Sequence, residues 1–178
     1  MNGGLNLRKK EDLITRRLAV AAVFMAMNIV LSSFGIPVPG GHLYLCDIPI
    51  YMAAILLDPF SAFVVGGVGS FIGDMLFYPA PMFVSLATHG IQAAVISLIA
   101  HHTLKTRPKP ASALAVSVGV VILVVGYTLG RAYVYATPEY AVLKLPFEFL
   151  QGLIGAVLGM ILCWRCGIRK LYLKIVGE

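Results

Sequence analysis

The feature that most constrains this chain is a series of apolar runs separated by short polar turns. Each run approaches the ~20 residues that a helix needs to cross a bilayer. The turns contain prolines, glycines and the Asp58-Pro59 pair, which are residues that interrupt helices. We therefore predict six membrane helices, over residues 18–34, 43–57, 60–77, 82–102, 111–135 and 143–164.

Composition excludes a soluble globular domain. The 178 residues are 59% hydrophobic and 12% charged, with a mean hydropathy of +0.88. Soluble domains carry about 25% charged residues, and a single core of this length cannot bury so much apolar surface. The predicted fold class is therefore an all-α integral membrane protein.

The basic residues set the predicted orientation. Twelve of the 14 Lys and Arg lie before the first run, between the fourth and fifth runs, or after the sixth. Membrane proteins concentrate these residues on the cytoplasmic side. We predict cytoplasmic N- and C-termini, with a basic segment 1–17, a membrane domain 18–164 and a basic tail 165–178. This clustering accounts for the net charge of +6 without nucleic-acid binding.

A small set of polar side chains remains inside the predicted helices, in the half away from the basic segments. An ionisable group at membrane depth is costly and marks a functional site by default. Because the polar groups stop halfway across, we predict an outward-facing binding cup. The residues expected to contact substrate are Asp47, Asp74, His89, Gln92, Tyr127, Arg131, Glu148 and Gln151.

Helical spacing favours such a cup. Tyr127, Arg131 and Tyr135 recur at every fourth position, so they share one helix face. Aromatic rings beside converging polar groups suit a small, flat, polar ligand. The alternative is that these groups only pair with one another, for example Arg131 with Asp74 or Glu148.

Two other classes of function stay open as alternatives. A channel or stand-alone secondary transporter needs polar groups through the full membrane thickness, and a secondary transporter places its site near the midplane. A membrane enzyme needs a nucleophile and a base, for which Asp74 and His89 are the only plausible pair. The chain has no serine-hydrolase, zinc-protease or nucleotide-binding motif, so we expect no catalytic residue.

Small residues and cysteines form two further patterns. Pairs of small residues four positions apart let membrane helices approach closely. They occur at Gly69 and Gly73, at Gly155 and Gly159, and at Ala22 and Ala26. We expect the glycine pairs to pack internally, whereas the alanine pair can dock a partner. The three cysteines, Cys46, Cys163 and Cys166, are expected to be reduced thiols, and no metal site is predicted.

The six short helices, the Ala22-x-x-x-Ala26 pattern and the segment GGHLYLCDIPIYMAAILLDPFSAFVVGGVGSFIGDMLFYPAPMF (residues 40–83) together resemble a known family. The family is that of the substrate-binding (S) components of energy-coupling factor (ECF) transporters. The resemblance covers nearly the whole chain. Cys46 departs from it, because a glycine is expected before Asp47.

The resemblance implies a multi-pass protein of the bacterial plasma membrane that captures a vitamin outside the cell and delivers it by toppling. It implies a membrane-embedded coupling protein and two cytoplasmic ATPases as partners. This chain then binds no cofactor, and ATP is used by the partners. Ala22 and Ala26 become the docking face, and the loop with Gly40, Gly41 and His42 becomes a lid.

Two expectations concern the segment after that loop. We expect Asp47 at the water-accessible mouth of the cup, as a ligand contact or a lid latch. Pro49 is expected to make the second helix irregular and to leave backbone groups near Asp47 free to bind.

The resemblance also bears on the substrate. Metal-transporting S components have an extra N-terminal segment that supplies ligands, and residues 1–17 contain no histidine, so nickel and cobalt are not expected. The chain looks most similar to S components of the pyridoxine or hydroxymethylpyrimidine type. Pantothenate, thiamine, folate and a queuosine precursor remain alternatives.

Overall fold

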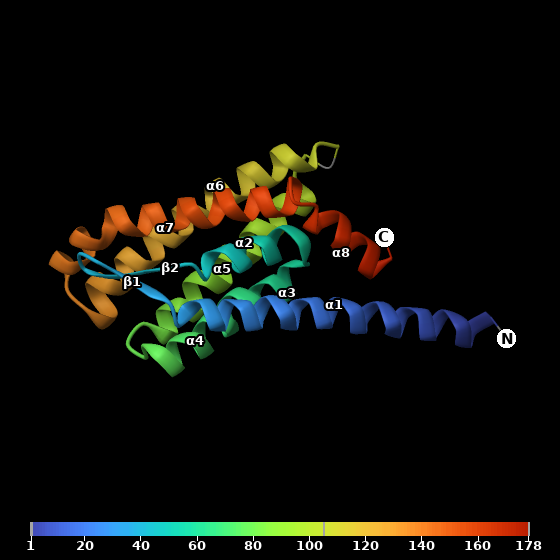
Figure 1. Ribbon diagram of the computed structural model, residues 1–178, viewed down its shortest axis with the longest axis horizontal. Coiled ribbons are helices and arrows are strands. Elements are labelled where there is room, and N and C mark those ends of the chain that lie inside the picture. The colour runs from blue at the N-terminus through green and yellow to red at the C-terminus, as the bar shows by residue number, and fades with distance from the viewer. Residues whose placement is uncertain (1, 105, 178) are drawn as a thin grey trace.

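The computed structural model describes residues 2–104 and 106–177, with side chains from residue 11 onward. It leaves out Met1 and Glu178 of the predicted basic segments, Lys105 of the loop between the fourth and fifth predicted helices, and the side chains of Arg8, Lys9 and Lys10. The described chain is an elongated helical bundle with one small hairpin (Figure 1). Its helices are α1 (Asn2–Ser32), α2 (Asp47–Leu56), α3 (Pro59–Phe63), α4 (Gly69–Phe77), α5 (Met82–His102), α6 (Pro108–Gly130), α7 (Pro138–Trp164) and α8 (Ile168–Val176). Two π-helical segments, η1 (Val64–Val68) and η2 (Arg131–Tyr135), join α3 to α4 and extend α6.

Five helical stretches are long and apolar enough to cross a membrane. They are Glu11–Ser32, Pro59–Phe77, Met82–His102, Pro108–Tyr135 and Pro138–Trp164, and Asp47–Leu56 is a shorter apolar helix. Their outward faces carry large exposed apolar side chains such as Leu18, Phe60 and Val142, which suit contact with lipid. These elements agree with the predicted helical membrane protein.

The all-α bundle has one exception at residues 35–44, which were predicted as a loop and the start of the second helix but form a hairpin. Strands β1 (Gly35–Val38) and β2 (Gly41–Tyr44) pair antiparallel, with Val38 opposite Gly41, so Pro39 and Gly40 form a two-residue turn. Gly40 has φ +80°, a backbone conformation that favours glycine. Pro39 and Gly40 are the second and third residues of the turn, where proline and glycine are common. The expected lid loop is therefore an ordered hairpin.

Several predicted helix boundaries are also wrong, for local reasons. α1 begins at Asn2 rather than at 18, because its first turns are polar and escape a search for apolar runs. α7 begins at Pro138 rather than at 143, since Thr137 caps it by accepting a hydrogen bond from the Tyr140 amide. The predicted tail contains α8, whose buried side chains are Tyr172 and Val176.

The second helix begins at Asp47 rather than at 43, and it is regular. Pro49 lies in its first turn, where a missing N–H costs nothing, because the first amides of a helix have no intrahelical partner. The expectation that Pro49 distorts this helix and frees nearby backbone groups is wrong.

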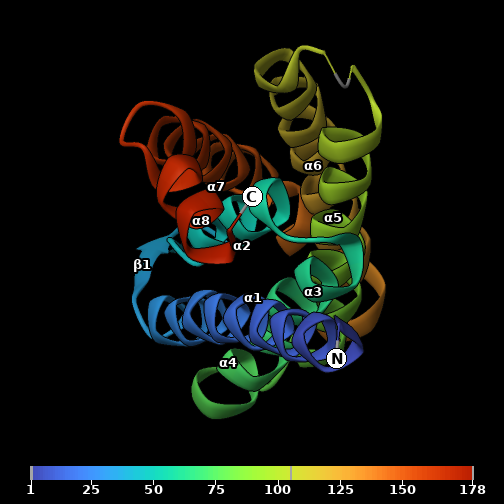
Figure 2. The same ribbon diagram turned by 90° about the vertical axis from the view of Figure 1, so that its right-hand side faces the viewer.

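The core is built around α2, which lies in the middle of the bundle when the molecule is viewed along its length (Figure 2). Every residue from Pro49 to Leu57 is buried. Two glycines of α7 make this possible, since a Cβ at Gly155 or Gly159 would lie 3.0 Å from Tyr51 atoms or closer. The α7 glycine pair therefore packs internally, as predicted.

The predicted helix 60–77 is one continuous helical rod made of α3, η1 and α4. Gly66 and Gly67 in η1 lie against α5, where an added Cβ would come within 2.6 Å and 2.8 Å of the carbonyl oxygens of His89 and Leu86. Gly69 and Gly73 approach α1 as closely, which confirms the predicted internal packing of this pair.

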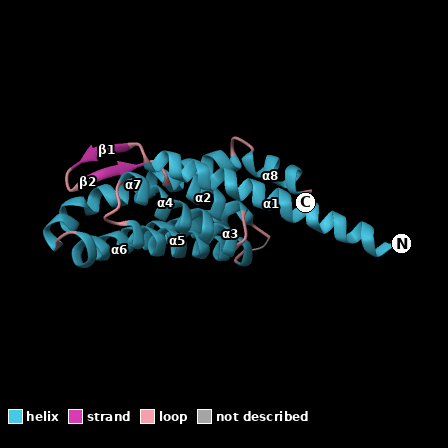
Figure 3. Ribbon diagram, turned by 90° about the horizontal axis from the view of Figure 1, so that it is seen from below, coloured by secondary structure: helices cyan, strands magenta, loops and turns pink. Residues whose placement is uncertain are grey.

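The hairpin and the two termini lie at opposite ends of the molecule (Figure 3). At the end with the termini, α8 packs beside α1, and the Arg16 Nη1 group donates a hydrogen bond of 2.9 Å to the Ile175 carbonyl oxygen. The bundle thus has a hairpin end and a terminal end with different chemistry.

Candidate functional site

A partly enclosed cavity of about 50 Å³ lies beneath the hairpin. It is lined by side chains from the hairpin, the start of α2, and α1, α4, α5, α6, η2 and α7. The lining residues are Ser32, Gly41, His42, Tyr44, Cys46, Ser70, Asp74, Tyr78, Pro81, His89, Tyr127, Arg131, Tyr135, Lys144, Glu148 and Gln151. Most of them are polar or aromatic, which makes the cavity a candidate site for a polar ligand.

A cluster of two cations and one carboxylate forms one wall. Glu148 Oε1 accepts a hydrogen bond of 2.8 Å from Arg131 Nη2 and lies 3.4 Å from Lys144 Nζ. Lys144 and Glu148 are almost fully buried, at 1% and 4% side-chain exposure. Arg131 also donates to the Gly40 carbonyl oxygen at 3.0 Å, which ties the hairpin turn to the bundle.

Asp47 lies directly behind the cavity lining and is 1% exposed. Gln151 connects it to the hairpin, because Gln151 Nε2 donates to Asp47 Oδ2 at 2.7 Å while its Oε1 accepts from the Tyr44 amide at 3.0 Å. The expectation of Asp47 at the water-accessible mouth is wrong, since the hairpin and α7 cover it. The hairpin is held by Arg131 and Gln151 rather than by an Asp47 latch.

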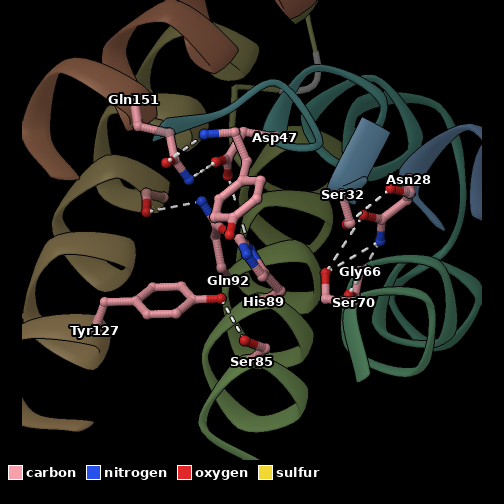
Figure 4. Close-up of polar contacts among 12 residues, drawn as sticks. Asn28, Ser32, Asp47, Gly66, Ser70, Ser85, His89, Gln92, Tyr127 and Gln151 are labelled. Carbon is pink, nitrogen blue, oxygen red and sulfur yellow. Dashed lines mark hydrogen bonds and ion pairs between the residues drawn. The ribbon is translucent and has the colours of Figure 1, made fainter. Parts of the chain in front are cut away.

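The floor of the site combines an imidazole and a phenol. His89 Nδ1 lies 2.8 Å from Gln92 Oε1, and Gln92 Nε2 donates to the Gly119 carbonyl oxygen at 3.3 Å. The His89 and Tyr127 rings meet edge to face with centroids 5.3 Å apart. Gln92 itself is buried behind His89 and orients it (Figure 4).

A second hydrogen-bonded chain leads from Tyr127 to α4. The Tyr127 hydroxyl lies 2.6 Å from Ser85 Oγ, and Ser85 donates to the Asp74 carboxylate. Asp74 therefore faces the cavity with one oxygen occupied, and the other oxygen is available to a ligand donor.

The opposite wall rests on a buried asparagine of α1. Asn28 Nδ2 donates to the Val65 carbonyl oxygen at 2.8 Å and to Ser70 Oγ at 3.1 Å. Ser32 donates to the Asn28 carbonyl oxygen at 2.9 Å (Figure 4). Because η1 does not follow the α-helical hydrogen-bond pattern, the side-chain amide of Asn28 satisfies a carbonyl there and also binds Ser70. The main-chain carbonyl oxygen of Asn28 holds Ser32, and both serines line the cavity.

Burial also changes the pKa of one hairpin residue, Tyr44. Partial burial, reinforced by the negative charge of Asp74, raises the pKa of Tyr44 to about 12. The phenol of Tyr44 is thus protonated at physiological pH and serves as a hydrogen-bond donor at the edge of the cavity.

The structure brings six of the eight predicted substrate contacts into the cavity lining: Asp74, His89, Tyr127, Arg131, Glu148 and Gln151. Asp47 and Gln92 stand one layer behind. Of the predicted lid residues, Gly41 and His42 line the cavity and Gly40 forms the turn. Ala22 and Ala26 lie on the exposed side of α1, away from the cavity.

Sequence reasoning missed several lining residues, including Ser32, Tyr44, Cys46 and Lys144. Lys144 was visible as one of only two Lys or Arg residues outside the basic segments and the loop 105–110. Its four-residue spacing to Glu148 is that of a helical ion pair. The serines carry no charge, so no hydropathy signal could have selected them.

Comparison with known proteins gives three findings. Residues 12–167 match the family described as "ECF-type riboflavin transporter, S component". The chain is 29% identical over 152 residues to "Thiamine precursor transporter HmpT" of Lactococcus lactis subsp. cremoris (strain MG1363), across 83% of this chain and 85% of that protein. It is 27% identical over 136 residues to an uncharacterized protein of Pyrococcus woesei, across 75% and 89% of the two chains.

A solved structure shares the fold. It is described as "Structure and mechanism of the S component of a bacterial ECF transporter", and it superposes with a TM-score of 0.66 over 88% of this chain and 98% of that one. The two sequences are 19% identical, so this likeness concerns the arrangement of the helices.

Proposed function

This chain belongs to the family of ECF-type riboflavin transporter S components, and we propose that its substrate is a single-ring heteroaromatic alcohol of the pyridoxine or hydroxymethylpyrimidine class. Members of this family are membrane-embedded substrate-capture subunits of vitamin transporters rather than enzymes, and they work together with an ECF module. The predicted resemblance, membrane location and transport role are confirmed.

The observation that carries the substrate proposal is the size of the cavity beneath the hairpin. At about 50 Å³ it offers room for roughly three to five water molecules, at about 10–15 Å³ each. One substituted six-membered ring displaces a comparable volume of water. A three-ring system such as a flavin requires the hairpin to move away.

The lining also matches such a ring in its chemistry. The edges of His89 and Tyr127 offer aromatic contacts, and Asp74 and Glu148 offer carboxylate oxygens that accept from amino or hydroxyl groups. Arg131 and Gln151 supply donors. In this proposal these six residues contact the substrate, whereas Asp47 and Gln92 hold them from behind.

Riboflavin is the second candidate, because the matching family is described by that vitamin. The Lactococcus lactis relative, in contrast, is named for a thiamine precursor, so relatives of this chain differ in what they carry. Pantothenate, thiamine, folate and a queuosine precursor are further alternatives within the same capture role.

For transport, we propose six membrane crossings with both termini and the basic segments 1–17 and 165–178 in the cytoplasm. The hairpin, including Gly40, Gly41 and His42, then closes the cavity on the outer side. This is supported by the position of the hairpin at the end opposite the termini (Figure 1) and by its tie to Arg131. Opening requires that tie to break.

We further propose that the partners are a membrane-embedded coupling protein and two ATPases, which use the ATP. The coupling protein contacts the exposed alanines of α1, Ala22 and Ala26, where small side chains permit close helix packing. Toppling of this chain on that partner then presents the cavity to the cytoplasm. A stand-alone secondary transporter is the alternative, and it predicts uptake without ATPases.

Calorimetric titration of the purified chain in detergent tests the substrate directly. The panel contains pyridoxine, hydroxymethylpyrimidine, riboflavin, thiamine, pantothenate, folate and a queuosine precursor. We expect about one equivalent of pyridoxine or hydroxymethylpyrimidine to bind more tightly than the rest. Tightest binding of riboflavin would contradict the single-ring proposal, and no binding by any compound would contradict the capture role.

A further inference from the structure

Three side chains with metal-binding atoms meet at the junction between the hairpin and α2. Cys46 and Asp47 are consecutive residues there, and His89 reaches them from α5. One ligand atom from each lies within 4.8 Å of the others, and all three residues are buried. Cys46 and His89 also line the cavity, so the cluster forms part of its floor.

The carboxylate of Asp47 is incompletely satisfied in this cluster. Gln151 Nε2 occupies its Oδ2 atom at 2.7 Å, while Oδ1 has no hydrogen-bond partner among the described residues. His89 Nδ1 lies 3.7 Å from Oδ1. Such a buried, unpartnered oxygen is costly unless a ligand or cation completes it.

The buried cations of the cavity are engaged elsewhere. Arg131 and Lys144 both lie against Glu148, at 2.8 Å and 3.4 Å. Neither cation forms an ion pair with Asp47 in the part of the chain that the structure describes.

We propose that Cys46, Asp47 and His89 bind a divalent transition-metal ion of the Zn²⁺ class at the floor of the cavity. A thiolate, an imidazole and a carboxylate form a ligand set that suits Zn²⁺ or Co²⁺, whereas Mg²⁺ and Ca²⁺ prefer oxygen ligands alone. The negative charges of the thiolate and the carboxylate balance the ion, so the metal site is neutral. This departs from the sequence-based expectation of a chain without a metal.

The geometry is close to that of a bound ion. Bond lengths of about 2.0–2.3 Å at tetrahedral angles place ligand atoms about 3.3–3.7 Å apart. The distance of 3.7 Å between Asp47 Oδ1 and His89 Nδ1 already lies in this range. Ligand atoms at the 4.8 Å limit of the cluster have to approach by about 1 Å to reach it.

One glutamine supports a metal ligand from behind, and a second glutamine releases its ligand when the ion binds. Gln151 holds the Asp47 carboxylate by Oδ2 and leaves Oδ1 directed into the cluster. Gln92 Oε1 lies 2.8 Å from His89 Nδ1, and coordination of an ion by Nδ1 replaces this contact. The ring proton then resides on Nε2. Such outer contacts orient metal ligands in proteins.

Three protein ligands leave one coordination position of a tetrahedral ion open. This open position faces the cavity, because Cys46 and His89 line it. A ring nitrogen or hydroxyl oxygen of the captured vitamin can fill that position. This last step rests on the proposed function, whereas binding of the metal does not. A metal at this place gives the site a means of selecting heteroaromatic ligands over apolar rings of equal size.

The test uses Co²⁺ alone, titrated into the full chain in detergent after treatment with a chelator. We expect one equivalent to bind with a thiolate-to-cobalt charge-transfer band that Zn²⁺ abolishes. Cys46→Ser removes the band, and Asp47→Asn and His89→Gln weaken binding by more than about 100-fold, beyond the usual cost of losing an outer contact. Cys163→Ser is the matched control, because Cys163 is a buried free cysteine in the terminal part of α7, outside the cluster.

Circular dichroism establishes that each variant keeps its helical content, and Cys46→Ala replaces Cys46→Ser if the serine variant unfolds. Absence of the charge-transfer band in the folded wild-type chain, or its survival in the folded Cys46 variants, overturns the proposal. Vitamin titrations run in parallel separate the two ideas. Vitamin binding without a cobalt band refutes only the metal site, whereas a cobalt band without vitamin binding refutes only the capture of that vitamin class.

Discussion

The hairpin end and the terminal end of the bundle use the same helices in opposite ways. At the hairpin end, α5, η2 and α7 present His89, Arg131, Lys144 and Glu148 to a cavity. Toward the terminal end, α2 is enclosed by neighbours, with Tyr51 and Ala53 fully buried. One end is a polar site closed by a hairpin, and the other is a close-packed apolar platform.

The difference shows where this chain places its unfavourable interactions. The ion pairs of Glu148 and the unpartnered carboxylate oxygen of Asp47 lie at the hairpin end, where a ligand can complete them. The terminal end offers little to a polar ligand but keeps the helices in register. If this division is correct, substitutions at the two ends should differ in kind: binding is lost at one end and stability alone is lost at the other.

Removing the carboxylate at the centre of the charged wall should have the largest effect. Glu148→Ala leaves Arg131 and Lys144 buried without their partner, and breaking a buried ion pair costs about 3–5 kcal/mol. We expect that loss in the free energy of unfolding in detergent, together with loss of vitamin binding. Glu139→Ala on the exposed start of α7 is the control. A loss below about 1 kcal/mol would contradict the buried pairing.

Adding one methyl group where α7 meets α2 should also destabilise the fold. Gly155→Ala places a Cβ 2.6 Å from the Asp47 Cβ and 3.0 Å from the Tyr51 ring, and overpacking of this kind costs about 1–3 kcal/mol. We expect weaker vitamin binding as well, because α7 is displaced from Asp47. Val157→Ala, on the exposed side of α7, should leave binding unchanged. Equal behaviour of the two variants in calorimetry would argue against a close α2–α7 contact.

The asparagine that supports η1 should have a smaller effect. Asn28→Ala leaves the Val65 carbonyl oxygen without its side-chain donor. Hydrogen bonds between membrane helices average about 0.6 kcal/mol and reach about 1.7 kcal/mol, and we expect a loss in that range. Thermal unfolding followed by circular dichroism measures it, with Ser117→Ala as the control, since the Ser117 hydroxyl only bonds to its own helix. An unchanged midpoint would show that η1 does not depend on α1.

At the turn between α2 and α3, Asp58→Ala should cost about 1 kcal/mol, the usual value for a lost helix N-cap. Partial burial alone would raise the Asp58 pKa, but hydrogen bonds from the Ser61 hydroxyl and from the Ser61 and Phe60 amides lower it. The pKa of Asp58 is lower in the folded state than in the unfolded state. The stability that the cap contributes is therefore complete above about pH 4 and is lost as pH falls through the folded-state pKa. Unfolding of wild type and variant across this pH range measures it; a difference that persists at the lowest pH would refute the cap.

The smallest effect on the isolated chain is expected on the exposed face of α1. Ala22→Trp and Ala26→Trp should change the free energy of unfolding by less than about 0.5 kcal/mol and leave vitamin binding unchanged. They should nevertheless block ATP-driven uptake by the assembled transporter, since a bulky side chain prevents close helix contact. Val30→Trp, also exposed on α1, tests whether the effect is specific. Normal uptake by both alanine variants would refute the docking face.

The sequence predicted the helical elements well because apolar runs of membrane length have few alternative structures. The hairpin was missed, although Pro39-Gly40 between two four-residue extended segments is a turn signal; here the search for helices hid a local pattern. The predicted face of Tyr127, Arg131 and Tyr135 does line the cavity, even though η2 departs from α-helical geometry.

What could not be predicted depends on contacts between distant segments. Asp47 has the sequence of an exposed helix start, yet Gln151, more than a hundred residues away, covers and binds it. The meeting of Cys46 with His89 depends on how closely α2 and α5 pack, which no spacing within one helix reveals. Local periodicity thus predicts which face of a helix is polar, but not which faces meet.

Amide hydrogen exchange with and without hydroxymethylpyrimidine tests the division of the molecule most directly. We expect ligand-dependent protection in the hairpin and its surroundings, residues 35–47, 127–135 and 144–151, and unchanged exchange at the terminal end, residues 98–104, 106–115 and 160–176. Protection centred on the terminal end, or exchange of the hairpin that does not respond to a ligand shown by calorimetry to bind, would contradict a capture site beneath the hairpin.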